Sequence, residues 1–381
     1  MTTMKTEMTI MKILNSSAKN TGIARYVEGI PNSEIYSLQI LNSEYPGKVI
    51  KPKFKYLPWS IKVNKPKIAF DIKSLENYVF IYSSQATPII SNDINNQFVI
   101  IHDILPIKYN PKRGVRKYIK KQIERFRDAR RVITPSNYTK EKLVKEFNYN
   151  TNKIDVIPSY ISPNLTITTK SKEELRKELN LPLNKKIIIN VAGGTPNKGN
   201  NELPIIMKIL PNDFILVHIG PEIKGERIIN IQNINDNLLS KYYQASDLYL
   251  ATSYDEGFGL PPIEAQYLGI PVIARKLKVF EETMGNTYIK FEDWNNITDV
   301  YEGFNNLDQA EGYWRQWYYT IMGGYNLKDE YAEKGKENAK KYTYEVFKNN
   351  WLKWWDQIWI RRQEYIYQKK RMRNMPNTEN G

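Results

Sequence analysis

Short runs of apolar residues alternate along the chain with segments of helical periodicity. The runs are rich in Ile, Val, Leu, Tyr and Phe and most lack a polar face, which is typical of strands buried on both sides of a parallel sheet. They cover residues 7–14, 77–84, 96–104, 130–136, 153–160, 185–193, 213–220, 247–253, 270–274 and 286–291. Helical patterns cover residues 113–129, 137–148, 171–180 and 260–269. This alternation predicts an α/β fold, with helices on both faces of parallel sheets.

One polar segment, residues 161–186, interrupts the alternation. We interpret it as a linker between two doubly wound, Rossmann-like domains, which predicts a ligand site in the cleft between them, beyond the carboxyl ends of the strands. The predicted boundaries are 1–165 for the first domain, 166–344 for the second, and 345–381 for a C-terminal helix with a basic tail. Within the first domain, we expect Asn137 or Thr139 to cap the helix at 137–148.

Composition narrows the chemistry of the 381-residue chain. There is no Cys, which excludes disulfides, thiolate metal sites and Cys nucleophiles and fits a reducing compartment. His102 and His218 are the two histidines, so a multi-His metal site is not expected. No uncharged apolar run reaches the length of a membrane span, and the first 17 residues resemble a strand more than a signal peptide. We expect a cytoplasmic protein, peripheral to a membrane at most.

The net charge of +15 is concentrated in the first half of the chain. Residues 1–165 hold 27 basic and 13 acidic side chains, a balance of +14, whereas residues 166–381 hold 29 and 28. The first half is therefore expected to meet an anionic partner, such as an anionic membrane or a phosphorylated acceptor. Nucleic acid is disfavoured, because no recognised binding module accompanies the charge.

Two segments could form this anionic contact or could have a purely structural role. Residues 111–131 carry ten basic and two acidic side chains, which suit either a solvated helix face or a surface for anionic lipid or a phosphorylated acceptor. The Trp-rich pattern WLKWWDQIWIRR at 351–362 suits either a membrane-interface belt or the buried face of the closing helix. We favour burial for the second segment.

Residues 253–274, SYDEGFGLPPIEAQYLGIPVIA, hold the strongest candidate site. Gly257 and Gly259 allow a tight turn and close approach of a ligand, and the following Pro-Pro pair suits a first helical turn. The start of a helix offers unpaired N–H groups that suit a phosphate. Glu256 precedes this helix and Glu264 is expected in its first turn, where carboxylate oxygens can bind neighbouring hydroxyls of a sugar or ribose. The stretch therefore predicts a sugar-nucleotide site.

Simpler interpretations exist for the individual residues. Glu264 could cap its own helix and Glu256 could be solvated, although their shared register with the Gly turn favours a site. Lys198 lies in GGTPNKG, which is neither a P-loop nor a Rossmann fingerprint, and could simply be exposed. His218 is flanked by strand residues, so a structural role is expected. No Asp-x-Asp pair of the kind that holds a metal–diphosphate is present, which favours metal-independent chemistry.

Several segments together resemble the retaining glycosyltransferases of glycosyltransferase family 4, which have the GT-B fold. EGFGLPPIE at 256–264 is similar to that family's E-x7-E motif. Further segments agree in order and spacing, including its Gly loop, His-Asp strand end and phosphate-binding Lys loop: TGIARYV, IHDILP, RRVITPSNYTKEKL, IDVIPSYI, VAGGTPNKGN and NDNLLSKYYQASDLYLATS. The resemblance covers roughly residues 10–290, and it implies a final helix that crosses back to the first domain.

The resemblance implies roles in the second domain for five residues of the motif. Glu256 would contact hydroxyls of the donor sugar. The backbone of Phe258, Gly259 and Leu260 would lie near the donor, and Glu264 would hold the ribose.

It implies roles for four further residues as well. Lys198 would neutralise the departing diphosphate, an effect that grows in a dry cleft. Gly194 would also contact the donor, and the Gly22 loop would close over the phosphates. His102 would face the donor sugar from the first domain, although a satisfied histidine at a strand end is the simpler alternative.

One departure from the family pattern concerns positive charge. Family members often have Arg just before the Lys, or about five residues ahead of it, whereas this chain has Asn197 and Gly193. Arg25 and Arg275 are candidates for the missing cation, and the sequence does not rank them.

These observations predict a retaining, metal-independent glycosyltransferase without a cofactor. It would move a hexose from a GDP- or UDP-sugar to a hydroxyl on a glycan, lipid or protein. The alternatives are a sugar-nucleotide epimerase or glycosidase on a similar scaffold, and a non-catalytic module that binds sugar nucleotides or membranes.

Overall fold

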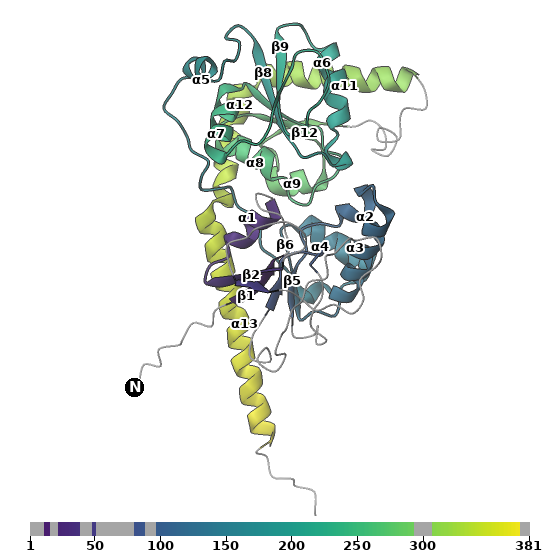
Figure 1. Cartoon of the computed structure of the whole chain (residues 1–381), viewed down its shortest axis with the longest axis vertical. Coiled ribbons are helices and arrows are strands. Elements are labelled where there is room, and N and C mark those ends of the chain that lie inside the picture. Colours follow the sequence, from purple (N-terminus) through teal and green to yellow (C-terminus); the bar gives the residue numbers. More distant parts are fainter. Residues whose placement is uncertain are drawn as a thin grey trace, which may run out of the picture.

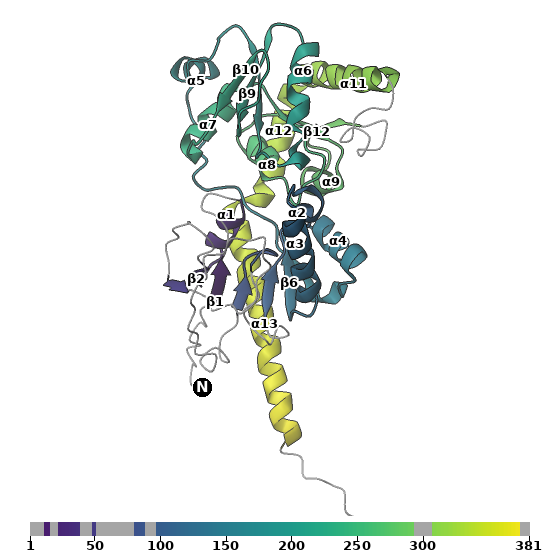
Figure 2. The same cartoon turned by 45° about the vertical axis from the view of Figure 1, so that its right-hand side comes forward.

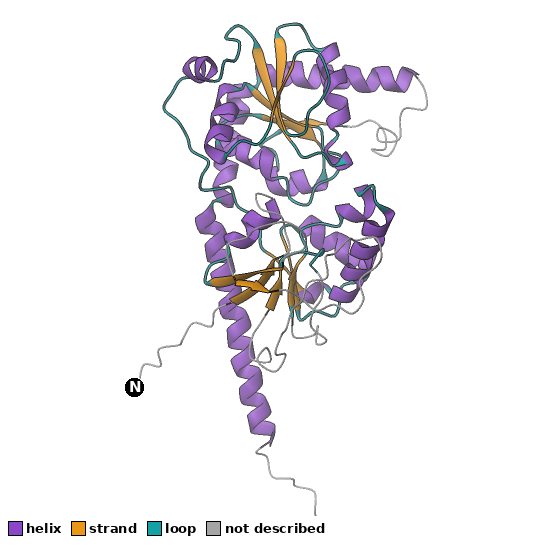
Figure 3. Ribbon diagram, viewed as in Figure 1, coloured by secondary structure: helices purple, strands orange, loops and turns teal. Residues whose placement is uncertain are grey.

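The computed structural model describes residues 11–15, 22–38, 48–50, 80–87, 97–292 and 307–373. In these ranges the chain forms two α/β domains stacked end to end (Figure 1). One long helix, α13 (Tyr344–Arg373), leaves the second domain and runs along the first, as both views show (Figures 1 and 2). Helices lie on both faces of the two sheets (Figure 3), which confirms the predicted doubly wound architecture.

The first domain contains a parallel sheet near its centre. Its described strands are β1 (Met11–Asn15), β2 (Ser33–Leu38), β3 (Lys48–Ile50), β4 (Phe80–Tyr82), β5 (Phe98–Ile100), β6 (Arg131–Thr134) and β7 (Ile154–Val156). They lie in the order β3-β2-β1-β4-β5-β6-β7, and every pairing is parallel. The helices are α1 (Gly22–Glu28), α2 (Leu105–Tyr109), α3 (Arg113–Phe126) and α4 (Asn137–Phe147).

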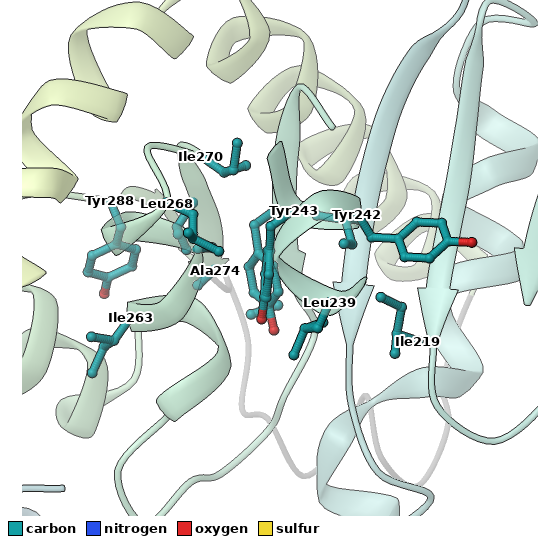
Figure 4. Close-up of a cluster of buried hydrophobic side chains, with 14 of the residues drawn as sticks. Ile219, Leu239, Tyr242, Tyr243, Ile263, Leu268, Ile270, Ala274 and Tyr288 are labelled. Atoms are coloured by element: carbon teal, nitrogen blue, oxygen red, sulfur yellow. The ribbon is translucent and has the colours of Figure 1, made fainter. Parts of the chain in front are cut away.

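The second domain repeats this plan with a second parallel sheet. Its strands are β8 (Lys186–Val191), β9 (Phe214–Ile219), β10 (Ile228–Ile231), β11 (Leu248–Ala251), β12 (Val272–Arg275) and β13 (Ile289–Phe291), in the order β10-β9-β8-β11-β12-β13. The helices are α5 (Lys172–Glu178), α6 (Leu203–Ile209), α7 (Asp236–Ala245), α8 (Leu260–Tyr267), α9 (Lys278–Met284), α11 (Leu307–Asn326) and α12 (Lys328–Ala339). Side chains of α7 and α8, such as Tyr243 and Ile263, contribute to one buried core beside the sheet (Figure 4).

Hydrophobic periodicity predicted most of the strands but not all of them. A described strand lies within or overlaps every predicted run, but β2, β3 and β10 were not predicted. The expected cap of α4 was wrong: Ser136 is the N-cap and accepts a hydrogen bond from the Thr139 N–H, because Asn137 is already helical.

Helix α13 closes the fold by packing on the first domain. Phe347, Trp351, Trp354 and Ile358 join the core of that domain. Trp354 also donates from Nε1 to Asp155 at 2.8 Å. The predicted crossing of the C-terminal helix is confirmed, and Trp351 and Trp354 form its buried face rather than an interfacial belt. Across the described residues, none of the helices is both long enough and apolar enough to traverse a bilayer.

Candidate functional site

The candidate loop joins the end of β11 to the start of α8, and two glycines make its path possible. Gly259 has φ of 89°, a left-handed conformation, and a Cβ there would lie 2.5 Å from Cε1 of Phe280. A Cβ at Gly257 would lie 2.6 Å from the carbonyl oxygen of His102. The first domain therefore touches the loop where a side chain would not fit. Helix α8 begins at Leu260 with proline in its first turn, as the sequence predicts.

The structure brings Glu256 and Lys198 into direct contact. Oε1 of Glu256 accepts hydrogen bonds from Lys198 Nζ at 2.6 Å and from Ser253 Oγ at 2.7 Å. Glu256 is 8% exposed, and the Lys198 side chain is 20% exposed. Thr252 donates from Oγ1 to the Lys198 carbonyl at 2.9 Å, which ties the Lys loop to the end of β11. A carboxylate and a cation thus face each other at the start of α8.

The structure excludes one of the two candidates for the missing cation. Asn197 and Gly193 supply no charge, and Asn197 is a buried structural residue that donates to the Asp255 carbonyl at 3.0 Å. Arg275 is 1% exposed and forms an ion pair with Glu202 at 2.5 Å. The suggestion that Arg275 could reach a pyrophosphate was therefore wrong, because its guanidinium is enclosed within the domain.

Glu264 is the fifth residue of α8, just past the first turn in which it was expected, and it is 3% exposed. Its Oε1 accepts a hydrogen bond from Arg25 Nη1 of the first domain at 2.7 Å, and Tyr243 Oη lies 3.4 Å from Oε2. Burial raises the pKa of this carboxyl, and the positive charge of Arg25 opposes that rise. No side chain caps α8, so the interpretation of Glu264 as a helix cap was wrong.

His102 and Asp103 follow the end of β5 and lie beside the loop. The His102 ring is hydrogen-bonded through Nε2 to the Ser83 carbonyl at 2.9 Å and meets Tyr26 edge-on at 5.1 Å. Burial lowers its pKa to about 4, so the imidazole is neutral at pH 7. Burial raises the pKa of Asp103 to about 6, with a further contribution from nearby Glu256. Sequence reasoning assigned no role to Asp103, and its only signal was its position next to His102.

Helix α4 of the first domain supports the loop from the other side. Ser136 donates from Oγ to the Gly257 carbonyl at 2.7 Å. Tyr138 Oη and Lys142 Nζ donate to the two oxygens of Asp255 at 3.0 and 2.6 Å. These contacts were not predicted, because they join residues more than 100 positions apart. Both domains therefore hold the loop that carries Glu256.

The remaining predicted residues lie around this centre. Gly22 begins α1, three residues before Arg25. Gly194 lies in the exposed loop after β8, where a Cβ would be 3.1 Å from Pro221 Cγ. The Phe258 ring packs on Tyr342 in the core, which leaves only its backbone for a donor. These contacts with a donor stay predictions.

His218 has the structural role that was expected. It is fully buried and bonded to Asn190 Oδ1 and the Pro221 carbonyl, both at 2.9 Å. Within the ranges that the structure describes, no cluster of His, Asp and Glu is arranged to hold a metal ion.

Comparison with known protein families identifies the region that holds this centre. Residues 171–307 match the family described as glycosyl transferases group 1. The O-antigen chain mannosyltransferase RfbU of Salmonella typhimurium is 26% identical over 263 residues, which is 58% of this chain and 69% of that protein. The D-inositol 3-phosphate glycosyltransferase of Mycolicibacterium smegmatis is 29% identical over 164 residues, which is 39% of this chain and 38% of that protein. The region that matches the family, residues 171–307, includes Lys198, Glu256 and Glu264.

Similarity of structure extends over almost the whole chain. The crystal structure of Alr3699/HepE from Anabaena in complex with UDP-glucose superposes with a TM-score of 0.66 at 15% identity, covering 91% of this chain and 99% of that one. This likeness shows that the two stacked domains and the returning helix form a GT-B fold.

Proposed function

We propose that this chain, which contains a glycosyl transferases group 1 domain at residues 171–307, transfers a hexose from a GDP- or UDP-sugar to a hydroxyl group of a glycan, lipid or protein. The observation that carries the proposal is the Glu256–Lys198 contact at the start of α8, with buried Glu264 farther along the same helix. A carboxylate that binds hydroxyls, a cation for a diphosphate and a second carboxylate for a ribose are the groups that a sugar nucleotide needs.

The names of similar proteins support the same donor class. RfbU is an O-antigen chain mannosyltransferase, and HepE was crystallised with UDP-glucose. A hexose donor and a glycan acceptor are therefore the first substrates to test.

The proposed reaction is a front-face displacement that retains the configuration at the sugar C1. The bond between C1 and the diphosphate oxygen breaks, and the acceptor oxygen bonds to C1 on the same face. The acceptor proton passes to an oxygen of the leaving phosphate. Lys198 and the unpaired N–H groups at the start of α8 stabilise the negative charge that develops there.

His102 and Glu256 act on the donor sugar in this proposal. Because the His102 imidazole is neutral at pH 7, it orients a sugar hydroxyl by hydrogen bonding and adds no charge. Glu256, held by Lys198 and Ser253, faces the sugar where positive charge develops. Loss of either contact is expected to slow turnover more than it weakens binding.

We further propose that the first domain contacts an anionic membrane surface through α3. Lys112, Arg113, Lys117, Lys120, Lys121, Arg125 and Arg127 are exposed on or beside this helix. Their only exposed acidic neighbours on that segment are Glu124 and Asp128. Clustered cations of this kind are attracted to anionic headgroups by about 1 kcal/mol each.

The test has two steps, binding and then transfer. UDP and GDP, each with its hexose conjugates, are screened for thermal stabilisation, because a ligand at 100 times its Kd adds about 2.7 kcal/mol to the free energy of unfolding. The stabilising donor is then incubated with candidate acceptors, with and without EDTA, and the anomeric configuration of the product is determined.

A retained configuration and EDTA resistance are expected. Stabilisation without any transfer would identify a binding module, and inversion at C1 would contradict the mechanism. Activity that EDTA abolishes and Mg²⁺ or Mn²⁺ restores would contradict metal independence.

A further inference from the structure

Arg25 reaches across the domain interface to the carboxylate proposed to bind the ribose. It lies on α1 of the first domain, whereas Glu264 lies on α8 of the second, 239 positions away in the sequence. Nη1 of Arg25 is 2.7 Å from Glu264 Oε1, and Nη2 is 3.1 Å from Asp236 Oδ1 at the start of α7. The Arg25 side chain is 28% exposed and that of Glu264 is 4% exposed. One guanidinium thus joins two carboxylates of the opposite domain.

The backbone of Arg25 and its partner Asp236 are both held by residues of the segment between the two domains. Tyr160 donates from Oη to the Arg25 carbonyl at 2.7 Å, and its ring packs 4.5 Å from that of Phe347 on α13. Ser162 donates from Oγ to Asp236 Oδ2 at 2.5 Å. Tyr160 and Ser162, two positions apart in the segment between the domains, therefore hold Arg25 and its partner Asp236. The position of the guanidinium thus depends on how the two domains are docked.

The other cations of the site are already paired. Lys198 contacts Glu256, and Arg275 contacts Glu202. Among the described residues, Arg25 is the cation with a hydrogen bond to Glu264. A buried carboxylate without a compensating charge is costly and tends to take up a proton.

Within the part of the chain that the structure describes, four charged or titratable groups face Glu264. They are Arg25 on α1, Asp236 and Tyr243 on α7, and Tyr249 on β11. Burial and the charge of Asp236 raise the pKa of Glu264, while Arg25 and the hydrogen bond from Tyr243 lower it, so loss of Arg25 would favour protonation. A protonated Glu264 loses the charge-assisted hydrogen bonds that would bind ribose hydroxyls.

We propose that Arg25 is a positioning residue for the donor: from the first domain it keeps the Glu264 carboxylate ionised and oriented toward the ribose. Recognition of the nucleotide by the second domain then requires the first domain to be docked. This inference rests on the proposed function, because it takes Glu264 as the ribose-binding residue.

A double-mutant cycle between Arg25 and Glu264 tests this inference. The Kd of the nucleoside diphosphate that stabilises the wild-type chain, UDP or GDP, is measured by calorimetry for wild type, Arg25→Met, Glu264→Gln and the double variant. We expect about a tenfold or greater loss of affinity in each single variant and no further loss in the double variant, because residues that act as a unit are not additive. Arg25→Lys should recover part of the affinity, and melting curves report whether each variant is folded.

The pH dependence adds a readout that a merely structural role would not change. In Arg25→Met the loss of affinity relative to wild type at the same pH should become smaller as the pH rises, because Glu264 regains its charge without Arg25. A pH-independent loss in Arg25→Met would contradict the inference.

Glu282→Gln is the matched control for loosened domain contact. Glu282 accepts hydrogen bonds from the N–H groups of Asn137 and Tyr138 at 2.6 and 2.8 Å, so it also joins the domains, but it has no contact with Glu264. Glu282→Gln should change Kd less than Arg25→Met does. The change should have the same size whether residue 264 is Glu or Gln. If Arg25→Met likewise gives equal losses with and without Glu264→Gln, Arg25 acts on the phosphate or on docking in general, and the inference is wrong. If Glu264→Gln itself leaves Kd unchanged, the proposed function fails instead.

Discussion

Two cation–carboxylate pairs of the second domain share one segment, since Lys198 and Glu202 are four positions apart, yet the pairs differ in environment. Lys198 and Glu256 are 2.6 Å apart, with side chains 20% and 10% exposed. Arg275 and Glu202 are 2.5 Å apart, with side chains 1% and 2% exposed. Rings surround the Arg275 guanidinium, including Tyr254 at 4.8 Å. The accessible pair can exchange partners with a ligand, and the enclosed pair cannot.

The enclosed pair nevertheless supports the accessible one. Arg275 donates from Nε to the Thr252 carbonyl at 3.1 Å, and the Thr252 hydroxyl donates to the Lys198 carbonyl at 2.9 Å. Trp317 and Tyr313 of α11 also donate to Glu202, which anchors this network to the outer layer of the domain. A structural ion pair thus sets the position of the loop that presents Lys198 to Glu256.

The largest effect is expected when the enclosed pair is broken. Arg275→Met should lower the free energy of unfolding by about 3–5 kcal/mol, because it leaves the buried Glu202 charge without a compensating cation. Urea denaturation measures the change. Lys276→Met is the control. Lys276 also forms an ion pair with a glutamate, Glu292, but both side chains of that pair are exposed, so the free energy of unfolding should scarcely change. Equal effects of the two substitutions would contradict the distinction between the pairs.

Breaking the accessible pair should affect catalysis instead of folding. Lys198→Met removes the cation proposed to stabilise the leaving diphosphate, which corresponds to about 2.7–4 kcal/mol, or roughly 10²–10³ in kcat. Steady-state kinetics and a melting curve separate the two effects. A variant that loses as much stability as Arg275→Met but keeps its turnover would reverse the assignment of the pairs.

The pH dependence of stability should reveal the buried His102–Asp103 pair. The His102 pKa falls from 6.5 to about 4, so its contribution to stability decreases as pH drops through that window. The Asp103 pKa rises from 3.8 to about 6, so its contribution increases as pH drops through nearly the same window. In wild type the two terms oppose each other, each by up to about 1.4 kcal/mol per pH unit.

Single substitutions expose these opposing terms. On lowering the pH from 7 to 4.5, His102→Gln should lose less stability than wild type, and Asp103→Asn should lose more. Urea denaturation at the two pH values measures both. Identical pH slopes in all three proteins would show that neither group is buried in the way described.

The smallest expected effect concerns the exposed charges of α3. Lys117→Glu/Lys121→Glu should weaken sedimentation with phosphatidylserine-containing vesicles at low salt, since exposed charges are screened over about 8 Å at physiological ionic strength. Lys334→Glu/Lys340→Glu makes the same charge change on exposed residues of the second domain and should have less effect. Binding that is equal for neutral vesicles, or absent for anionic ones, would remove the membrane proposal.

Periodicity predicted the second domain well because its strands are continuous apolar runs. It missed β2, β3 and β10. The sequences of β2 and β10, SEIYSL and IINI, include polar residues, and β3 is only the three residues KVI. The cap of α4 was misplaced by one position because Ser136, Asn137 and Thr139 all have capping side chains. Only the backbone conformation, extended at Ser136 and helical afterwards, distinguishes them.

The motif around Glu256 could be predicted because its chemistry is local. Gly257, Gly259 and the prolines constrain one loop, and Lys198 was identified from a second short segment. The enclosure of Arg275 and the contact of Arg25 with Glu264 could not be predicted, since they join residues 73 and 239 positions apart. Such pairings follow from the docking of domains and the packing of α11, which leave no periodic signal in the sequence.

The central claim is that Glu256 and Glu264 bind two parts of one donor molecule. Steady-state kinetics of Glu256→Gln and Glu264→Gln test it most directly, with melting curves to confirm folding. Glu256→Gln should mainly lower kcat, by about 10–150-fold for one lost charged hydrogen bond of roughly 1.5–3 kcal/mol. Glu264→Gln should mainly raise the KM for the donor, because a ribose contact is present in ground state and transition state alike. Full activity and unchanged donor affinity in both folded variants would contradict the account.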